Sequence, residues 1–420
     1  MKKRLSIITA LFIAVSTLSG CAMTGSPSPE ATEEGSNDPE SAQSNDAASE
    51  ASSTELIILR DLFEPLFEEA SASASSSTIE KAETEEEKED AKEEIQKLTF
   101  VFFGDSQIAN GRADGTDIAT LITRRVPNSE SINLGIGGTT AALEQSTSDY
   151  LDYENWNSTC FLGMVYALEG KVDREKLLSS QPTVLENMNK VDPEEVDYYV
   201  IEYGANDFFN KTPLDHTQTE LNQVYHFYGA MCLGIDELKK ISPNAKFIVM
   251  TPFYSVYKDA DGNIIGDSYI VSNGIGTLAE YAKKAVNVAE DEGAIDFDGM
   301  FMAHSDLYLD TIEKYTIDGI HLSLTGRQIF ARLLAHLPNW AEGYEPYAYL
   351  ETDNIKIDEF DPEQVYRYRD DMLQYYYPEY YEKMMNGEYL LAPPPQDTDS
   401  ENESDNDSNN EASSEAASES

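Results

Sequence analysis

Five short runs of apolar residues lie along the middle of the chain, at 98–103, 131–134, 197–203, 245–250 and 294–297. Each run is rich in β-branched or aromatic side chains, which favour strands. The runs contain few polar positions, as is typical of strands that are covered on both faces. The pattern therefore predicts a buried sheet.

Between most of these runs, apolar positions recur at helical spacing, in segments at 117–125, 218–241, 277–292 and 325–336. Strands that alternate with helices form βαβ units, and such units build a parallel sheet with helices on both faces. We therefore expect an α/β fold, a three-layer α/β/α sandwich with a parallel sheet of about five strands.

Two segments do not fit simple connections in such a sandwich. Residues 150–195 contain helical pieces of their own, and we expect them to form an insertion. Residues 256–271 alternate in the manner of strands around Asp261-Gly262, a pair that favours a hairpin turn. Acidic residues at this turn also resemble a calcium-binding loop, but Ile264 occupies the position that such a loop reserves for glycine. The hairpin is therefore the better interpretation.

The N-terminus has the organisation of an export signal. Residues 1–20 contain the basic stretch MKKR and the apolar stretch LSIITALFIAVSTL, which is shorter than the ~20 residues of a membrane-spanning helix. The following LSGC resembles the lipobox of bacterial lipoproteins, in which the cysteine is lipidated. The resemblance implies a lipid anchor at Cys21 and a protein held at the cell membrane, on its extracytoplasmic side. An ordinary signal peptide with a chance cysteine is the alternative.

Acidic segments flank the expected folded domain at 98–338. Residues 21–97 should form a disordered tether with a short apolar patch at 54–70, and residues 396–420 a disordered tail, because such compositions bury too little apolar surface to fold. The formal net charge of −49 argues against nucleic acid as a partner, since phosphate binding needs basic surface. The charge indicates solubility rather than a cationic substrate.

Cysteine and histidine are too sparse to predict a metal site. Besides Cys21 the chain contains only Cys160 and Cys232, which could form one disulfide in an exported protein, although the sequence does not show that they meet. No spacing of Cys and His resembles a zinc site. We expect no metal and no cofactor, and the oligomeric state stays open.

Residues 339–395 form an extension that is dense in tyrosine, as in YEPYAY and QYYYPEYYEKM. One interpretation is an aromatic platform that stacks on sugar rings or lines an acyl pocket. The other is an extension whose rings pack over the sandwich with their hydroxyls in water. We favour the packing interpretation.

Four short motifs occur in order, each at the end of a strand or the start of a helix. They are GDS at 104–106, NLGIGGTT at 133–140, GAND at 204–207 and DGIH at 318–321. Each motif alone is compatible with an ordinary turn. Open α/β sheets, however, place their sites at the carboxyl ends of the strands, so the four motifs together indicate one site.

In this order, the motifs resemble the blocks of the SGNH hydrolases, the GDSL-type esterase and lipase superfamily, over residues 98–337. The resemblance implies a flavodoxin-like sandwich that hydrolyses ester bonds. It assigns Ser106 as the nucleophile, His321 as the base and Asp318 as the residue that orients His321. These three roles are the ones that nucleophilic catalysis requires, because a serine hydroxyl is a weak nucleophile without a base within hydrogen-bond reach.

The resemblance also implies an oxyanion hole. Its donors would be the backbone N–H groups of Ser106 and Gly138 and the side-chain amide of Asn206, with Gly137 as the fallback for Gly138. One residue departs from the family pattern, because Gln107 follows the nucleophile where the family name implies leucine. We expect that this change affects the fit of the substrate rather than the chemistry.

The sequence as a whole predicts a surface-tethered serine esterase that hydrolyses acyl esters, with acetyl esters of glycans as the leading substrates. Two alternatives stay open: an O-acyltransferase that acts on a cell-surface polysaccharide, and a non-catalytic glycan-binding lipoprotein. The intact motifs argue against the second alternative, because a binding module needs no such set of residues. The acyl chain length and the alcohol stay undetermined.

Overall fold

The computed structural model describes residues 95–144, 150–218, 222–301, 304–364 and 369–392. Within these residues, five parallel strands form one sheet in the order β2-β1-β3-β4-β7. They are β1 (Leu98–Gly104), β2 (Ser129–Asn133), β3 (Tyr198–Glu202), β4 (Lys246–Met250) and β7 (Ile295–Phe297). Each strand lies on one of the five apolar runs, so the predicted parallel sheet is confirmed.

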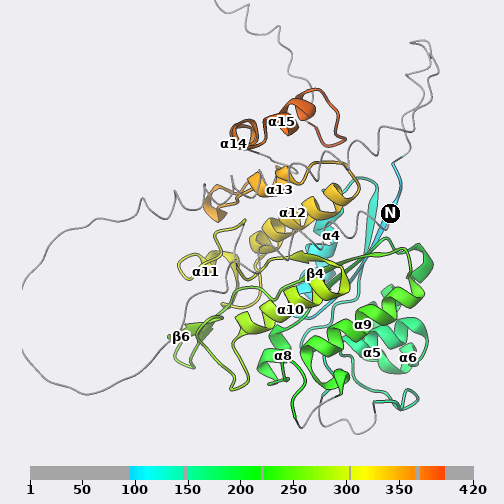
Figure 1. The fold of residues 1–420 in the computed structure, drawn as a ribbon. Coiled ribbons are helices and arrows are strands. Elements are labelled where there is room, and N and C mark those ends of the chain that lie inside the picture. The colour runs from blue at the N-terminus through cyan, green and yellow to red at the C-terminus, as the bar shows by residue number, and fades with distance from the viewer. Residues whose placement is uncertain (1–94, 145–149, 219–221, 302–303, 365–368, 393–420) are drawn as a thin grey trace, which may run out of the picture. The chain divides into compact units, whose positions relative to one another are not determined.

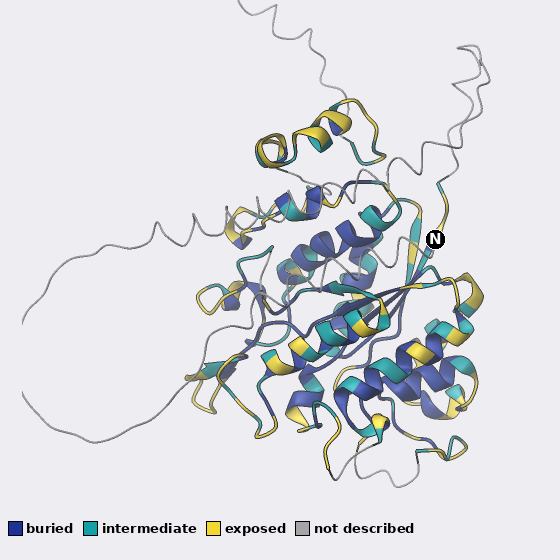
Figure 2. Cartoon of the chain, viewed as in Figure 1, coloured by how far each residue is buried: buried dark blue, intermediate teal, exposed yellow. Residues whose placement is uncertain are grey.

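Helices cover both faces of this sheet and complete the predicted three-layer sandwich (Figure 1). On one face, α4 (Ile118–Ile122) packs against α12 (Leu324–Ala341). On the other face, α9 (Phe227–Ile241) contacts both α5 (Phe161–Glu169) and α10 (Leu278–Glu292). The central strands β1, β3 and β4 and the helix faces that contact them are largely buried, which gives the protein one large apolar core (Figure 2).

Three helices differ in length from the prediction. The helix predicted over 117–125 is shorter, because α4 ends at Ile122. Residues 219–221 of the helix predicted over 218–241 lie outside the described residues, and in the part from 222 onward the α-helix begins at α9. There the His226 side chain accepts a hydrogen bond from the N–H of Gly229 and caps the first turn. The helix predicted over 325–336 continues to the end of α12 and includes Pro338. The Asn339 side chain donates to the carbonyl of Arg125, which ties this last part of α12 to the α4 side.

The segment 150–195 connects β2 to β3 and contributes to the sandwich itself. Its first helix, α5, is buried from Phe161 to Leu168, and the Phe161 ring meets the ring of Phe103 from β1 edge-on at 5.5 Å. The rest of the segment adds two short helices, α6 (Arg174–Leu177) and α7 (Pro182–Met188). The segment therefore combines a helix of the core with peripheral additions.

The hairpin predicted at 256–271 is present. β5 (Val256–Lys258) and β6 (Ile264–Asp267) pair antiparallel, and Gly262 occupies the turn with a φ of 85°. This pair forms a separate two-stranded sheet. β5 also donates from the N–H of Val256 to the carbonyl of Gly319, so the hairpin supports the loop that carries the DGIH motif.

The tyrosine-rich extension packs in two ways. Its first part joins the main core through Leu350, Ile355 and Ile357. Its later helices, α14 (Asp370–Tyr376) and α15 (Pro378–Met385), pack around Tyr349 of α13 (Ala348–Thr352) in a small cluster of their own. The first part thus packs on the sandwich mainly through aliphatic side chains, whereas Tyr377, Tyr380 and Tyr381 pack against the small cluster.

A buried ionic cluster fixes this extension to α12. His336 is hydrogen-bonded to Glu345 at 2.6 Å and to Asp353 at 3.0 Å, and Arg332 pairs with the same Asp353. Burial lowers the pKa of His336, but the two carboxylates outweigh this effect and raise the pKa to about 9. The imidazole is therefore charged at neutral pH and acts as a structural cation.

The predicted signal peptide, Cys21, the acidic tether up to residue 94 and the acidic tail lie outside the described residues. Across the part of the chain that the structure describes, no helix combines the length and the apolar character needed to cross a membrane. Cys160 and Cys232 are both free thiols.

Candidate active site

The site lies at the carboxyl edge of the sheet, where the direction of the strand order reverses. The chain leaves β1 for β2 on one side and then returns to β3 on the other side. Ser106 begins α3 (Ser106–Ala109) directly after β1, and Asn206 lies in α8 (Ala205–Phe209) directly after β3. Open α/β sheets form a crevice at such a point, which explains why motifs that are about a hundred residues apart meet here.

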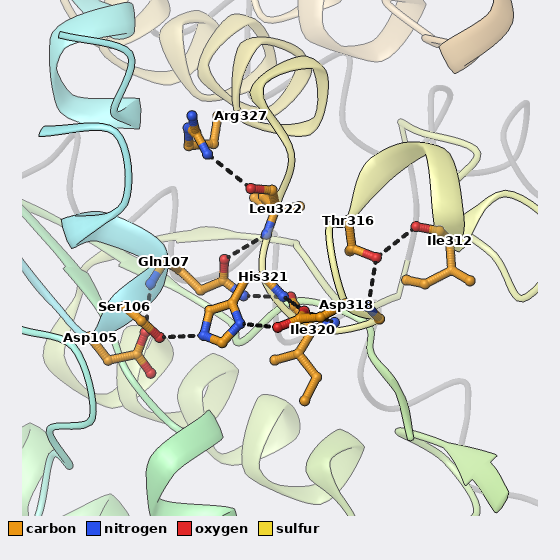
Figure 3. Close-up of polar contacts among 11 residues, drawn as sticks. Asp105, Ser106, Gln107, Ile312, Thr316, Asp318, Ile320, His321, Leu322 and Arg327 are labelled. Carbon is orange, nitrogen blue, oxygen red and sulfur yellow. Dashed lines mark hydrogen bonds and ion pairs between the residues drawn. The ribbon is translucent and has the colours of Figure 1, made fainter. Parts of the chain in front are cut away.

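His321 and Asp318 reach Ser106 from the loop between α11 (Ile312–Tyr315) and α12 (Figure 3). The Nε2 atom of His321 lies 3.0 Å from Oγ of Ser106, and Nδ1 lies 2.7 Å from Oδ2 of Asp318. Oδ1 of Asp318 accepts hydrogen bonds from the N–H groups of Ile320 and His321 at 2.9 and 2.8 Å. The structure thus brings together the three residues that the sequence selects as a triad.

The charge state of Asp318 determines which nitrogen of His321 carries the proton. Partial burial raises the pKa of Asp318, but the hydrogen bonds from His321 outweigh it and hold the pKa below its ordinary value. Asp318 is therefore ionised at neutral pH, and a carboxylate next to Nδ1 requires a proton on that nitrogen. The lone pair of Nε2 is then directed at the Ser106 hydroxyl.

Backbone N–H groups without acceptors lie beside the nucleophile. Within the described residues, the N–H groups of Ser106, Gly137 and Gly138 donate no hydrogen bond. A β-carbon added to Gly137 would lie 3.6 Å from Cβ of Ser106, so this turn passes directly beside the nucleophile. Gly138 has open space around it but a φ of 81°, so the left-handed backbone and not crowding favours glycine there.

Asn206 is held in place by the acid of the GDS motif. Its Nδ2 atom donates to Oδ2 of Asp105 at 2.8 Å, while Oδ1 of Asp105 accepts from the N–H of Gln107 at 2.9 Å. A side-chain amide has two N–H bonds, so the second one remains available to a substrate oxygen. Asp105 is thus a structural carboxylate that orients a possible oxyanion donor.

A second buried acid, Glu202, lies behind Asp105 at the end of β3. It is fully buried and lies against the carboxyl group of Asp105. Burial raises the pKa of Glu202 well above its ordinary value, and the neighbouring Asp105 raises it further. The folded protein therefore favours the protonated form of Glu202. No sequence motif includes Glu202, although an acid within the apolar run 197–203 is a visible signal.

Two further residues brace the turns of the site. Asp207 accepts hydrogen bonds from the N–H groups of Ala141 and Ala142 at 2.8 and 3.3 Å, which connects α8 to the segment after Gly138. Arg112 donates to the carbonyl of Gly135 at 2.6 Å and holds the start of the same segment. These contacts give Asp207 a structural role, and Arg112, which no sequence motif singles out, supports the same segment.

The assembled groups are those of nucleophilic acyl transfer: a hydroxyl beside an oriented base, and several N–H donors close to the hydroxyl. Over the described ranges, no three or more His, Cys, Asp or Glu side chains are arranged as a group that could hold a metal ion.

The family comparison agrees with this geometry. The model of the GDSL-like lipase/acylhydrolase family matches residues 100–334, which is more than half of the chain. The chain therefore belongs to this family, the SGNH hydrolase superfamily that its motifs resemble. The protein is accordingly a carboxylic ester hydrolase. No curated protein matches the chain in a sequence comparison.

Solved structures with a similar arrangement include several esterases. A possible lipase from Chitinophaga pinensis is 19% identical, with a TM-score of 0.41 over 59% of this chain and 99% of that chain. A carbohydrate acetylesterase from Sinorhizobium meliloti is 15% identical, with a TM-score of 0.35 over 58% of this chain and 100% of that chain. At these values nothing about the substrate of this protein follows.

Proposed function

We propose that the protein is a serine esterase that hydrolyses acyl esters through Ser106, His321 and Asp318. The observation that carries the proposal is the continuous hydrogen-bonded line from Oγ of Ser106 through both nitrogens of His321 to Asp318, with distances of 3.0 and 2.7 Å. These distances are within the reach that a nucleophile and its base require.

In the first half of the reaction, Oγ of Ser106 attacks the ester carbonyl carbon while Nε2 of His321 takes the hydroxyl proton. The carbonyl oxygen becomes an oxyanion, which would accept hydrogen bonds from the N–H groups of Ser106 and Gly138 and from the amide of Asn206. The intermediate then breaks the bond to the alcohol oxygen, and His321 returns the proton to the leaving alcohol. An acyl group remains on Ser106.

In the second half, water replaces the alcohol. His321 takes a proton from the water as it attacks the acyl carbon, and the same donors stabilise the second oxyanion. Collapse of this intermediate releases the carboxylic acid and returns the proton to Oγ of Ser106. A sugar hydroxyl in place of water would make the same steps an acyl transfer.

The openness of the site supports an ester of a large alcohol, such as an acylated glycan with acetyl as the leading acyl group. The side chains of His321 and Asp318 are 32% and 46% exposed, and Gly138 is also exposed. A bulky alcohol can therefore project into solvent while its ester carbon reaches Ser106. Turnover of nitrophenyl esters of increasing acyl length, beside acetylated xylan and peptidoglycan, would define both parts of the substrate.

The change Ser106→Ala tests the nucleophile. We expect it to lower kcat by several orders of magnitude with an unchanged melting temperature, as loss of a triad member does in serine hydrolases. The exposed Ser179 offers a matched control, because Ser179→Ala makes the same chemical change in the turn that follows α6. Undiminished turnover in pure Ser106→Ala protein would refute the assignment.

The proposal includes a lipid anchor at Cys21, which follows from the lipobox resemblance alone. Cys21→Ser should release the protein from the membrane fraction without altering its specific activity. Fractionation of cells that express either form, followed by an ester assay of each fraction, measures both effects. A Cys21→Ser protein that stays with the membrane would argue for an uncleaved signal or a second anchor.

A further inference from the structure

Gln107, the residue that departs from the family pattern, is buried and uses both ends of its side-chain amide. It is 3% exposed and begins α3 together with Ser106. Its Nε2 atom donates to the carbonyl of Ile320 at 2.8 Å, and its Oε1 atom accepts from the N–H of Leu322 at 3.2 Å. Figure 3 shows both bonds crossing from the nucleophile helix to the loop that carries His321.

The two bonded backbone groups lie on either side of His321 in the chain. We propose that Gln107 is a positioning residue that sets the distance between His321 and Ser106 by holding the backbone before and after the histidine. The inference rests on the proposed function, because it takes His321 as the base of Ser106. A leucine at this position could make neither bond.

The loop that carries His321 needs hydrogen bonds to another part of the protein to fix its distance from Ser106. Asp318 and His321 belong to one local turn, in which Asp318 binds both the imidazole and the backbone N–H of His321. These bonds keep the pair together but would move with it if the loop shifted relative to Ser106. Within the described residues, the bonds of Gln107 are the only hydrogen bonds between α3 and this loop besides the Ser106–His321 bond.

A second anchor holds the far end of the loop. Arg327 donates from Nη1 to the carbonyl of Leu322 at 2.9 Å and from Nε to the carbonyl of Thr116 at 2.8 Å. Leu322 is therefore bound at its N–H by Gln107 and at its carbonyl by Arg327. Of these two anchors, only Gln107 belongs to the helix that begins with the nucleophile, so it connects the loop to the backbone that carries Ser106.

Removal of the amide should act on the geometry of proton transfer. The carbonyl of Ile320 and the N–H of Leu322 would lose buried partners, and buried polar groups without partners favour a shift toward water. A displacement of the base by about 1 Å can lower a rate by ~10²-fold. We therefore expect Gln107→Leu to lower kcat roughly 10- to 100-fold with KM changed less than about twofold.

A double-mutant cycle distinguishes positioning of His321 from a general structural role. Steady-state kinetics on one short-chain nitrophenyl ester would compare the wild type, Gln107→Leu, His321→Ala and the double variant, with a thermal melt of each. If Gln107 acts through His321, Gln107→Leu should cause no further loss once His321 is absent. An equal loss in both backgrounds, or an unchanged kcat in Gln107→Leu, would overturn the proposal.

Gln107→Glu keeps the test decisive if the leucine variant does not fold. A neutral carboxyl group offers the same donor and acceptor as the amide, whereas an ionised one has no donor for the carbonyl of Ile320. The kcat of Gln107→Glu relative to wild type should therefore fall as pH rises, and a ratio independent of pH would contradict the proposal. Gln328→Leu on α12 is the matched control and should behave as wild type.

The outcome also separates this inference from the function on which it rests. An active Ser106→Ala protein would defeat the proposed function itself. An inactive Ser106→Ala protein beside a fully active Gln107→Leu protein would leave the esterase proposal intact and defeat only the positioning role.

Discussion

Ser106 and Asn206 lie at the ends of two neighbouring strands, whereas His321 lies on a loop that comes 215 residues after Ser106. The acids beside the first pair, Asp105 and Glu202, are fully buried. The acid beside the imidazole, Asp318, is 46% exposed at its side chain. The nucleophile half of the site is thus part of the protein core, and the acid–base half lies on its surface.

The difference suggests how each half is held in place. Strand register fixes the nucleophile half, since Gly104 pairs with Glu202 across β1 and β3 and a β-carbon on Gly104 would lie 2.9 Å from the Glu202 carbonyl oxygen. A local turn and a few long-range hydrogen bonds fix the acid–base half. Substitutions of the buried acids in the first half should therefore change stability, whereas substitutions in the second half should change mainly activity.

The largest expected effect comes from the exposed half. Asp318→Asn should lower kcat by about 10⁴-fold, because a neutral amide no longer enforces the imidazole tautomer that accepts the Ser106 proton. The melting temperature should hardly change, since Asp318 is half exposed. Kinetics and thermal melts of this variant beside Asp310→Asn, an exposed acid nearby, would measure both. A large fall in the melting temperature of Asp318→Asn would contradict the conclusion that the acid–base half contributes little to stability.

A smaller effect is expected from the oxyanion donor. Asn206→Ala should lower kcat by ~10²–10³-fold with little change in KM, because the donor acts mainly on the transition state. Asn206→Asp should be at least as harmful, since it places a negative charge beside the developing oxyanion. Asn210→Ala at the end of α8 is the control. A normally folded Asn206→Ala enzyme with full kcat would remove Asn206 from the mechanism.

The smallest effect concerns stability and tests the buried half. The pKa of Glu202 is raised in the folded protein above the ordinary 4.5, so the folded state binds its proton more tightly than the unfolded state does. Wild-type stability should therefore decline as pH rises above 4.5, by at most about 1.4 kcal/mol per pH unit from this group, until the folded-state pKa is passed. Glu202→Gln has no titrating carboxyl group at this position, so its stability should not show this decline with rising pH.

Denaturant unfolding of both proteins from about pH 5 to about pH 9 measures this difference. The free energy of unfolding of Glu202→Gln, relative to that of the wild type, should increase as pH rises. Glu195→Gln, at an exposed position, should follow the wild type throughout. Parallel curves for Glu202→Gln and wild type would show that the carboxyl group is not held neutral by the core.

Local patterns in the sequence determined most of the sandwich. The five apolar runs could be assigned to strands because a strand buried on both faces needs apolar residues at nearly every position. The four motifs could be assigned to one site because parallel strands present their carboxyl ends at one edge. Helix ends were harder to predict. The start of α9 depends on the side chain of His226, which caps the first turn, and the spacing of apolar residues does not reveal such a cap.

Contacts between distant segments were decided only by the tertiary structure. The sequence shows Gln107 as a departure from a family pattern, but its partners at Ile320 and Leu322 are more than two hundred residues away. It shows Glu202 as an acid in a strand, but not that Asp105 lies beside it in the core. Periodicity and motif spacing are local properties, whereas burial and hydrogen-bond partners depend on which segments the fold brings together.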